Sequence, residues 1–173
     1  ACQPIIAGFR AAAMGLPSIP VKGMLGSDLL TISEVVGSQT EIKDPFTGET
    51  LIAVRAIEPD VTIIHAQKAD EYGNVRIEGP FYEDVIKAKA AKKVVVTVEE
   101  LISNREIRKR PEATTIPHFI VDAVVEAPKG AYPCSCFNYY DAAYDHIKAY
   151  LKAAAADQFE QYLEDNIYRR ASA

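Results

Sequence analysis

Residues 58–100 decide the fold, and they read EPDVTIIHAQKADEYGNVRIEGPFYEDVIKAKAAKKVVVTVEE. Residues 61–66 are a short apolar run, rich in β-branched side chains, which predicts a buried strand rather than a helix. Residues 81–92 place apolar side chains at close to helical spacing, with lysines in the later turns where cations suit the helix dipole. Residues 94–99, VVVTVE, are a second continuous apolar strand. This order indicates a crossover onto a parallel sheet that is covered on both faces.

A turn separates the first strand from the predicted helix. Its residues are Tyr72, Gly73 and Asn74, of which Gly73 or Asn74 can adopt a positive φ angle. Residues 75–77 then form a short strand-like piece. The helix is therefore expected to begin only after this second, shorter strand.

The residues before this stretch predict three further elements. Residues 3–14 fit a helix that ends at Gly15. Residues 16–24 follow as extended chain, because their two prolines disfavour a helix. Residues 40–57 are typical of two strands joined by a reverse turn.

The residues after this stretch are less regular. Four basic residues between 105 and 110 are interpreted as a solvated loop rather than a binding patch. A strand-like segment is centred on residues 119–125, and an aromatic, irregular segment follows at residues 132–146. From Asp141 onward, apolar residues at helical spacing predict one long or two successive amphipathic helices.

Composition limits the class of protein. A chain of 173 residues with 49% hydrophobic residues suits one globular domain, expected to span residues 1–173. A formal net charge of −5 argues against a nucleic-acid binder. No segment approaches the roughly 18 apolar residues of a membrane span, so we expect no membrane partner and a cytoplasmic location. Because the chain starts on an apolar segment at Ala1, we expect the domain to be incomplete at its N-terminus.

The cysteines do not predict a metal site. There are three of them, and Cys134 and Cys136 lie close together in sequence. A closed zinc site needs more soft ligands at suitable spacings. We therefore expect free thiols and no metal.

One loop is the candidate substrate-binding segment. It runs from Lys22 to Asp28, contains Gly23 and Gly26, and has Ser27 before the final acid. Either it is a structural turn in which Ser27 or Asp28 caps a short helix, or its amide groups face an anionic ligand. The loop lacks the spacing and the lysine of a nucleotide-binding P-loop.

No catalytic residue can be assigned from the sequence. His65 has the best position of the three histidines, because ligands gather near the carboxyl ends of strands in open α/β sheets. A structural histidine is the interpretation that we favour. Glu99 and Glu100 end the next strand, and paired carboxylates suit acid–base or nucleophilic chemistry. Adjacent strand residues point to opposite faces, however, so these two carboxylates are not expected to act together.

Two longer stretches carry a resemblance to a known family. Residues 59–102 and residues 114–136, which read TTIPHFIVDAVVEAPKGAYPCSC, resemble the α subunit of family I coenzyme A transferases, in the branch typified by glutaconate CoA-transferase. The resemblance is an ordered series of a strand, a GN turn, a helix ending in AAK, a strand ending in VEE and a TIP segment before FIVDAVV. It covers about residues 9–150.

This resemblance implies a three-layer α/β/α fold with a mostly parallel sheet, and its implied partner is a homologous β subunit. It implies acyl-CoA and carboxylic acid substrates, and no permanently bound cofactor. The nucleophilic glutamate of such enzymes belongs to the β subunit, within a motif that this sequence lacks, so Glu99 and Glu100 do not inherit its role. The loop of residues 22–28 would then form a wall of the shared site.

Two alternatives remain open at this point. Related two-subunit enzymes hydrolyse ring-derived acyl-CoA thioesters with an α-subunit carboxylate that lies upstream of the region present here. A noncatalytic α/β effector-binding module is the alternative from another functional class.

Overall fold

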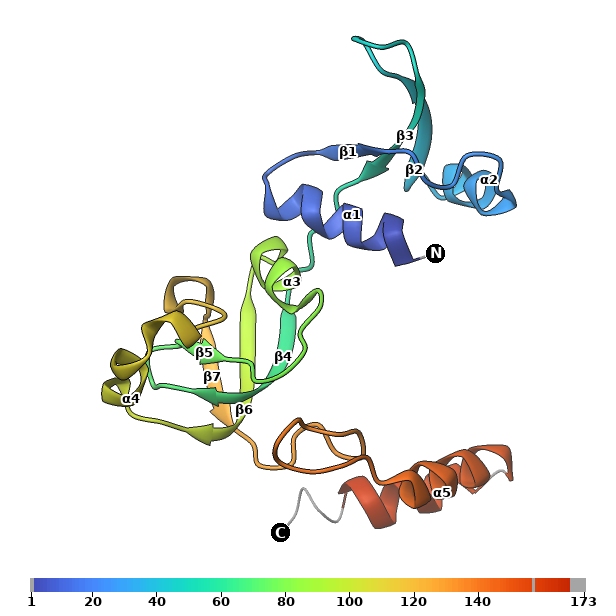
Figure 1. Cartoon of the computed structure of the whole chain (residues 1–173). Helices are drawn as coiled ribbons and strands as arrows, with labels where there is room; N and C mark the ends of the chain where they lie inside the picture. The colour runs from blue at the N-terminus through green and yellow to red at the C-terminus, as the bar shows by residue number, and fades with distance from the viewer. Residues whose placement is uncertain (1, 157, 169–173) are drawn as a thin grey trace. The chain divides into compact units, whose positions relative to one another are not determined.

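The computed structural model describes residues 2–156 and 158–168. The chain divides into two compact units, Ala1–Pro128 and Lys129–Ala173, and each is described by itself. The first unit holds both sheets, so the predicted α/β class is confirmed (Figure 1). Among the described helices, none has the length and apolar character that a membrane crossing requires.

The four-stranded sheet contains the predicted crossover. Its order is β5-β4-β6-β7, with bounds Val75–Arg76, Thr62–Ala69, Val94–Leu101 and Ala123–Glu126. β4 is parallel to β6 and β6 is parallel to β7, whereas β5 is antiparallel to β4. Helix α3 (Asp84–Ala90) lies within the connection from β5 to β6. The strand–helix–strand prediction is therefore confirmed.

The main core lies on one face of this sheet. Alternate residues of β4 and β6 are buried, while Ile63 on the opposite face of β4 is 71% exposed. The buried cluster consists of Ile64, Ala66, Ala69, Val75, Ala88, Val94, Val96, Val98 and Ile116. The apolar runs of the sequence thus build the core through the two-residue period of a strand.

A turn stabilised by a buried aspartate joins β4 to β5. Gly73 has a φ angle of 98°, as expected for this turn. β4 continues to Ala69, three residues beyond the predicted end at Ala66. The earlier end was wrong because Lys68 was taken as a polar interruption, whereas its ammonium group pairs with Glu78 at 2.9 Å.

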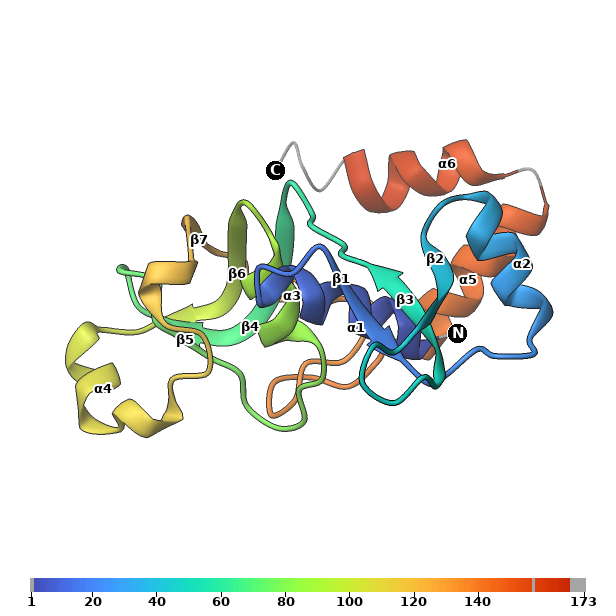
Figure 2. The same ribbon diagram turned by 90° about the horizontal axis from the view of Figure 1, so that it is seen from above.

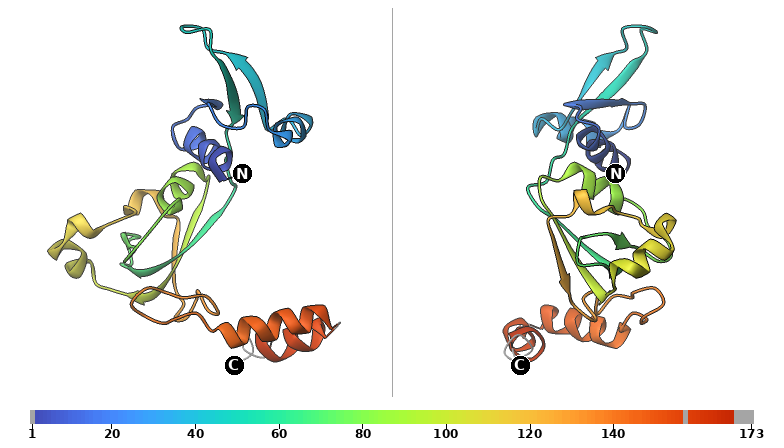
Figure 3. Two further views of the ribbon diagram at one scale, coloured as in Figure 1. Left: turned by 45° about the vertical axis from the view of Figure 1, so that its right-hand side comes forward. Right: turned by 90° about the vertical axis from the view of Figure 1, so that its left-hand side faces the viewer.

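The first 57 residues form a smaller antiparallel sheet with two helices. Its elements are α1 (Cys2–Ala13), β1 (Ser18–Val21), α2 (Asp28–Val35), β2 (Gln39–Lys43) and β3 (Thr50–Arg55). The strand order is β1-β3-β2, so β1, with Pro20, is an edge strand. The first helix and the β2–β3 hairpin were predicted, and Figure 3 shows this hairpin clearly. The pairing of β1 with β3 was not anticipated.

The basic segment is a helix, not the predicted loop. α4 (Asn104–Lys109) begins at Ser103, whose hydroxyl accepts a hydrogen bond from the Glu106 N–H at 3.3 Å. Ile107 is its single buried residue. Periodicity missed this helix because one apolar position sets no repeat, although Ser103 and Glu106 have the spacing of a capping box.

Two further boundaries differ from the prediction. α3 begins at Asp84 rather than near residue 81, because the Asp84 carboxylate accepts a hydrogen bond from the Tyr82 N–H and holds a turn there. The strand expected around residues 119–125 begins only at Ala123. Two short 3-10 helices precede it, η1 (Pro111–Ala113) and η2 (His118–Ile120).

The second unit contains two successive helices, as predicted. They are α5 (Tyr144–Ala155) and α6 (Phe159–Leu163), followed by a π-helical turn, η3 (Glu164–Tyr168) (Figure 2). Tyr150 packs edge-on against Phe159 and Tyr162, and the Tyr162 hydroxyl lies 2.6 Å from His146 Nε2. No described residue of α5 or α6 is buried, so these contacts are made at the surface of the helices.

Candidate functional site

The predicted substrate-binding loop connects β1 to α2. Two of its residues have left-handed backbone angles, Met24 with φ 79° and Gly26 with φ 73°. A Cβ atom at Gly26 would have no heavy atom within 4 Å, so the glycine is needed for its backbone angle and not for lack of space. A Cβ atom at Gly23 would lie 2.1 Å from Gln3 Oε1 on α1. The loop is therefore compact and lies against the first helix.

Ser27 fixes the end of the loop. Its N–H donates to Met24 O at 3.0 Å, and its hydroxyl accepts a hydrogen bond from the Leu29 N–H at 3.3 Å. Asp28 lies in the first turn of α2, where a negative charge suits the helix dipole. Ser27 is thus the N-cap, one of the two capping residues that the sequence left open.

The same loop leaves two backbone donors uncommitted. Within residues 2–156 and 158–168, the N–H groups of Leu25 and Gly26 meet no acceptor. Lys22 forms an ion pair with Glu49 at 2.8 Å, and both side chains are largely exposed. The loop can therefore offer amide donors and an exchangeable ammonium group to an anionic ligand.

A cavity of about 330 Å³ adjoins the loop. Met24 and Leu29 form one side, Ile5 of α1 another, and Val54 and Ile57 the wall beside β3. Most of this lining is apolar. Its volume lies at the lower end of the range for small-molecule sites, so it suits a short hydrocarbon group.

His65 and Glu99 come together on neighbouring strands, which the sequence did not predict. His65 Nε2 lies 2.7 Å from Glu99 Oε1, and His65 Nδ1 lies 2.8 Å from Thr97 Oγ1. The Glu99 side chain is 3% exposed, whereas Glu100 is exposed. The two glutamates therefore differ in environment, as the strand argument predicted. The parallel register, which sets His65 opposite Thr97, could not be derived from the sequence.

Asp70 is a second buried carboxylate, and its surroundings are structural. It accepts hydrogen bonds from the Asn74 N–H at 2.8 Å, from Asn74 Nδ2 at 2.9 Å, from Asn104 Nδ2 at 2.7 Å and from the Tyr72 N–H at 3.2 Å. Burial alone would raise the pKa of Asp70, but these hydrogen bonds together hold it below its ordinary value. The carboxylate ties the β4–β5 turn to the start of α4.

The remaining histidines and cysteines form no second site with these groups. The backbone N–H of His118 donates to Asn74 Oδ1, and the ring of His146 contacts Tyr132 and Tyr162 within the second unit. Cys134 and Cys136 are thiols, as expected.

Comparison with known proteins identifies related chains. Residues 3–127 match the family described as "Coenzyme A transferase". A subunit of glutaconate CoA-transferase from Acidaminococcus fermentans is 40% identical, over 92% of this chain and 54% of that protein. The crystal structure of that transferase matches with a TM-score of 0.87 at 38% identity, over 95% of this chain and 56% of that one.

Two other relatives are named for different activities. A variant of the decarboxylase AibA/AibB matches with a TM-score of 0.80 at 35% identity, over 95% of this chain and 59% of that one. The IpdA subunit of a cholesterol ring-cleaving hydrolase from Mycobacterium tuberculosis is 30% identical, over 86% of this chain and 53% of that protein. The chain thus spans about half the length of the curated relatives that it matches.

Proposed function

Because the chain belongs to the coenzyme A transferase family, we propose that it is the α-type subunit of a two-subunit enzyme that moves CoA between an acyl-CoA and a carboxylic acid. The observation that carries this proposal is the 40% identity to a glutaconate CoA-transferase subunit over nearly the whole chain. A homologous β-type subunit is the proposed partner. A cytoplasmic location and the lack of a nucleic-acid or membrane partner remain predictions from composition.

The proposed chemistry puts the nucleophile on the partner. A carboxylate of the β-type partner attacks the thioester carbonyl, and the CoA thiolate leaves as an acyl anhydride forms. The thiolate then attacks the enzyme's side of the anhydride, which releases the first carboxylic acid and leaves CoA bound as an enzyme thioester. The acceptor carboxylate repeats these steps in reverse. No cofactor is consumed.

The loop of residues 22–28 is this chain's proposed contribution to the site. The uncommitted N–H groups of Leu25 and Gly26 would donate to the oxyanion that develops at the thioester carbonyl. Gly23 and Ser27 would hold the loop in shape, through the contact with Gln3 and the cap of α2. The exposed ammonium group of Lys22 would meet a substrate carboxylate, and Asp28 would stabilise the helix that follows. The apolar cavity beside Met24 would hold the acyl chain.

Two other activities are favoured by specific relatives, a hydrolase and a decarboxylase. The three reactions differ in their products. The chain should be purified together with a β-type subunit, then incubated with an acyl-CoA in the presence and absence of an acceptor acid. Formation of the acceptor's CoA ester supports the transferase, free CoA formed without an acceptor supports the hydrolase, and released CO₂ supports the decarboxylase.

The chain alone provides the control. Because no nucleophile motif occurs in the sequence, the isolated chain should transfer no CoA. Appreciable turnover by the isolated chain would contradict the assignment of the nucleophile to the partner. A purely effector-binding protein would yield none of the three products with any partner.

A further inference from the structure

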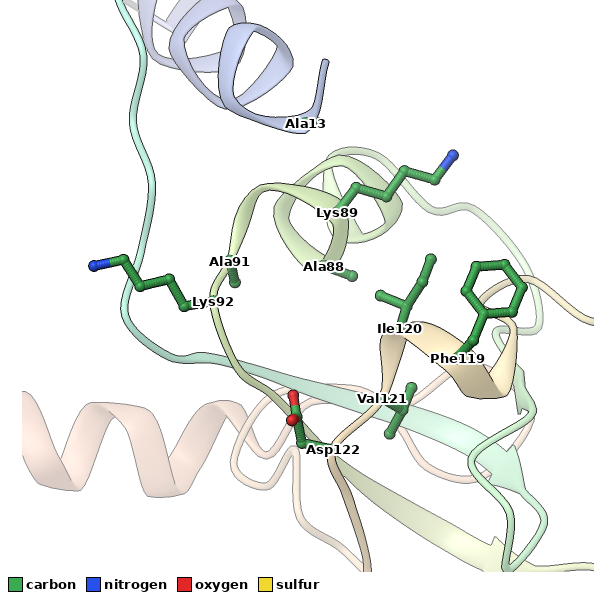
Figure 4. Close-up of a pocket in the computed structure, with 9 residues that line it drawn as sticks. All are labelled: Ala13, Ala88, Lys89, Ala91, Lys92, Phe119, Ile120, Val121 and Asp122. Atoms are coloured by element: carbon green, nitrogen blue, oxygen red, sulfur yellow. The ribbon is translucent and has the colours of Figure 1, made fainter. Parts of the chain in front are cut away.

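A second cavity lies at the opposite end of α1 from the loop. Its volume is about 520 Å³, within the range of small-molecule sites. It is bordered by Ala13 at the end of α1, by the last turn of α3 and by η2 (Figure 4). Ala88 and Ala91 line its inner surface, where short side chains leave the space open. Nothing in the function proposed above uses this cavity.

The charges around this cavity are mainly positive. Lys89 borders it and has no ion pair within the described residues. Lys92 pairs with Asp60 at 2.9 Å, but both side chains are more than half exposed, so the pair exchanges readily with another anion. The acidic lining residue, Asp122, is already engaged by Lys93 Nζ at 2.7 Å and by the Val94 N–H at 2.8 Å. The cavity therefore offers ammonium groups to an anionic ligand.

An exposed aromatic ring borders the same cavity. Phe119 in η2 is 77% exposed, which is high for a large apolar side chain. Its ring meets the ring of His118 edge-on, with centroids 5.8 Å apart, and Ile120 continues the apolar wall. In Figure 4, Phe119 and Lys89 border the cavity from η2 and α3, respectively. A flat ring beside a cation is the combination that a phosphorylated nucleoside uses, through stacking and through its phosphate.

We infer that this cavity binds the 3′-phosphoadenosine end of coenzyme A, with the adenine against Phe119 and the 3′-phosphate at Lys89. The inference rests on the proposed function, because it assumes that the ligand of the chain is a CoA ester. It adds a nucleotide site to the acyl site at the loop.

Helix α1 sets the distance between the two sites. Ala13 at its end lines this cavity, while Gln3 in its first turn contacts Gly23 of the loop. A helix of 12 residues is about 18 Å long. This length is comparable with the pantetheine and diphosphate part of CoA, which separates the nucleoside from the thioester. One molecule can therefore occupy both sites.

Calorimetric titration of the 173-residue chain with CoA, dephospho-CoA, adenosine 3′,5′-bisphosphate and pantetheine tests the inference. We expect CoA and the bisphosphate to bind, and pantetheine to bind at least about tenfold more weakly than CoA. Lys89→Gln should weaken CoA about tenfold and leave dephospho-CoA unchanged. Phe119→Ala should weaken both about fivefold or more.

Two variants serve as matched controls, and both should bind CoA as the wild type does. Lys152→Gln removes an exposed lysine of α5, and Phe46→Ala removes a ring that is 93% exposed at the β2–β3 turn. No binding of the bisphosphate, or equal binding of CoA by wild type, Lys89→Gln and Phe119→Ala, would overturn the nucleotide site. That result would leave the proposed function standing if the complex with a β-type subunit still transfers CoA. A complex without any CoA-dependent reaction would instead contradict the proposed function, whatever the nucleotide binds.

Discussion

The two sheets of the first unit use their apolar residues differently. The parallel strands and their surroundings bury a cluster of nine residues, whereas the antiparallel sheet buries only Ala7, Leu30, Ile52 and Val54 as a cluster. Around α2, the apolar side chains of Leu25, Leu29, Ile32 and Val36 are 42–69% exposed. Apolar content alone therefore does not measure a region's contribution to folding, because only burial removes apolar surface from water. The predicted substrate loop belongs to the less buried region.

The largest expected effect tests this contrast directly. Ile116 is fully buried in the larger cluster, so Ile116→Ala should lower the free energy of unfolding by about 2 to 5 kcal/mol. Ile32 is 62% exposed, and Ile32→Ala should change it by no more than about 0.5 kcal/mol. Denaturant titration measures both. Equal losses would break the contrast between the two regions.

The next effect concerns the buried carboxylate beside the parallel sheet. Asp70→Asn places an amide donor opposite the amide donors of Asn74 and Asn104. We expect a loss of about 1.5 to 3 kcal/mol in the free energy of unfolding, because a charge-assisted hydrogen bond is removed in a buried place. A variant as stable as the wild type at neutral pH would show that the network does not hold the turn.

The same carboxylate predicts a pH dependence. The pKa of Asp70 is lower in the folded chain than its ordinary value of 3.8. Its contribution to stability is therefore complete above that value, and it is lost as the pH falls from 3.8 through the lower folded-state pKa. In denaturant titrations across this acid range, the wild type should lose stability more steeply than Asp70→Asn. Parallel curves would contradict this assignment.

A smaller loss is expected at the turn glycine. Gly73 has φ 98°, and a Cβ atom there would lie 3.1 Å from Val121 Cβ. Gly73→Val should therefore cost about 1 to 3 kcal/mol through backbone strain and crowding. An unchanged denaturant midpoint would mean that the turn relaxes freely.

The smallest expected effect on stability lies in the loop, where the effect on activity should be largest. Gly26 and Gly48 both have φ angles near 70° and open space around a Cβ atom, so each change to valine should cost about 1 to 2 kcal/mol. In the complex with a β-type subunit, only Gly26→Val should raise KM or lower kcat, by about tenfold or more. If both variants keep wild-type kinetics, the loop is a structural turn and not part of the site.

Much of the first unit could be predicted because its signals are local. The apolar runs of β4 and β6, the GN turn and the stop of α1 at Gly15 each depend on a few neighbouring residues. α4 and the pairing of β1 with β3 were missed because contacts distant in sequence decide them. Arg76 Nη2, for example, donates to the carbonyl groups of Glu106, Ile107 and Arg110 at the end of α4.

The candidate site was predictable only in part. Two glycines and a serine before an acid indicated a turn with a helix cap, and Gly26 and Ser27 have these roles in the structure. The contact of Gly23 with Gln3 and the pairing of His65 with Glu99 join elements whose arrangement the sequence does not state. Whether the loop binds substrate remains a prediction for the kinetic measurement above.

Pro20 in the edge strand β1 affects how the chain associates with other chains. Pro17 O accepts a hydrogen bond from the Ala56 N–H, so alternate residues from Pro17 face β3, and Ser18 and Pro20 face outward. Proline has no N–H group, which leaves Ser18 as the single outward donor of the strand. An intruding strand from another molecule would therefore find an incomplete row of partners along this edge. The proline thus protects a sheet with little buried core from edge-to-edge aggregation.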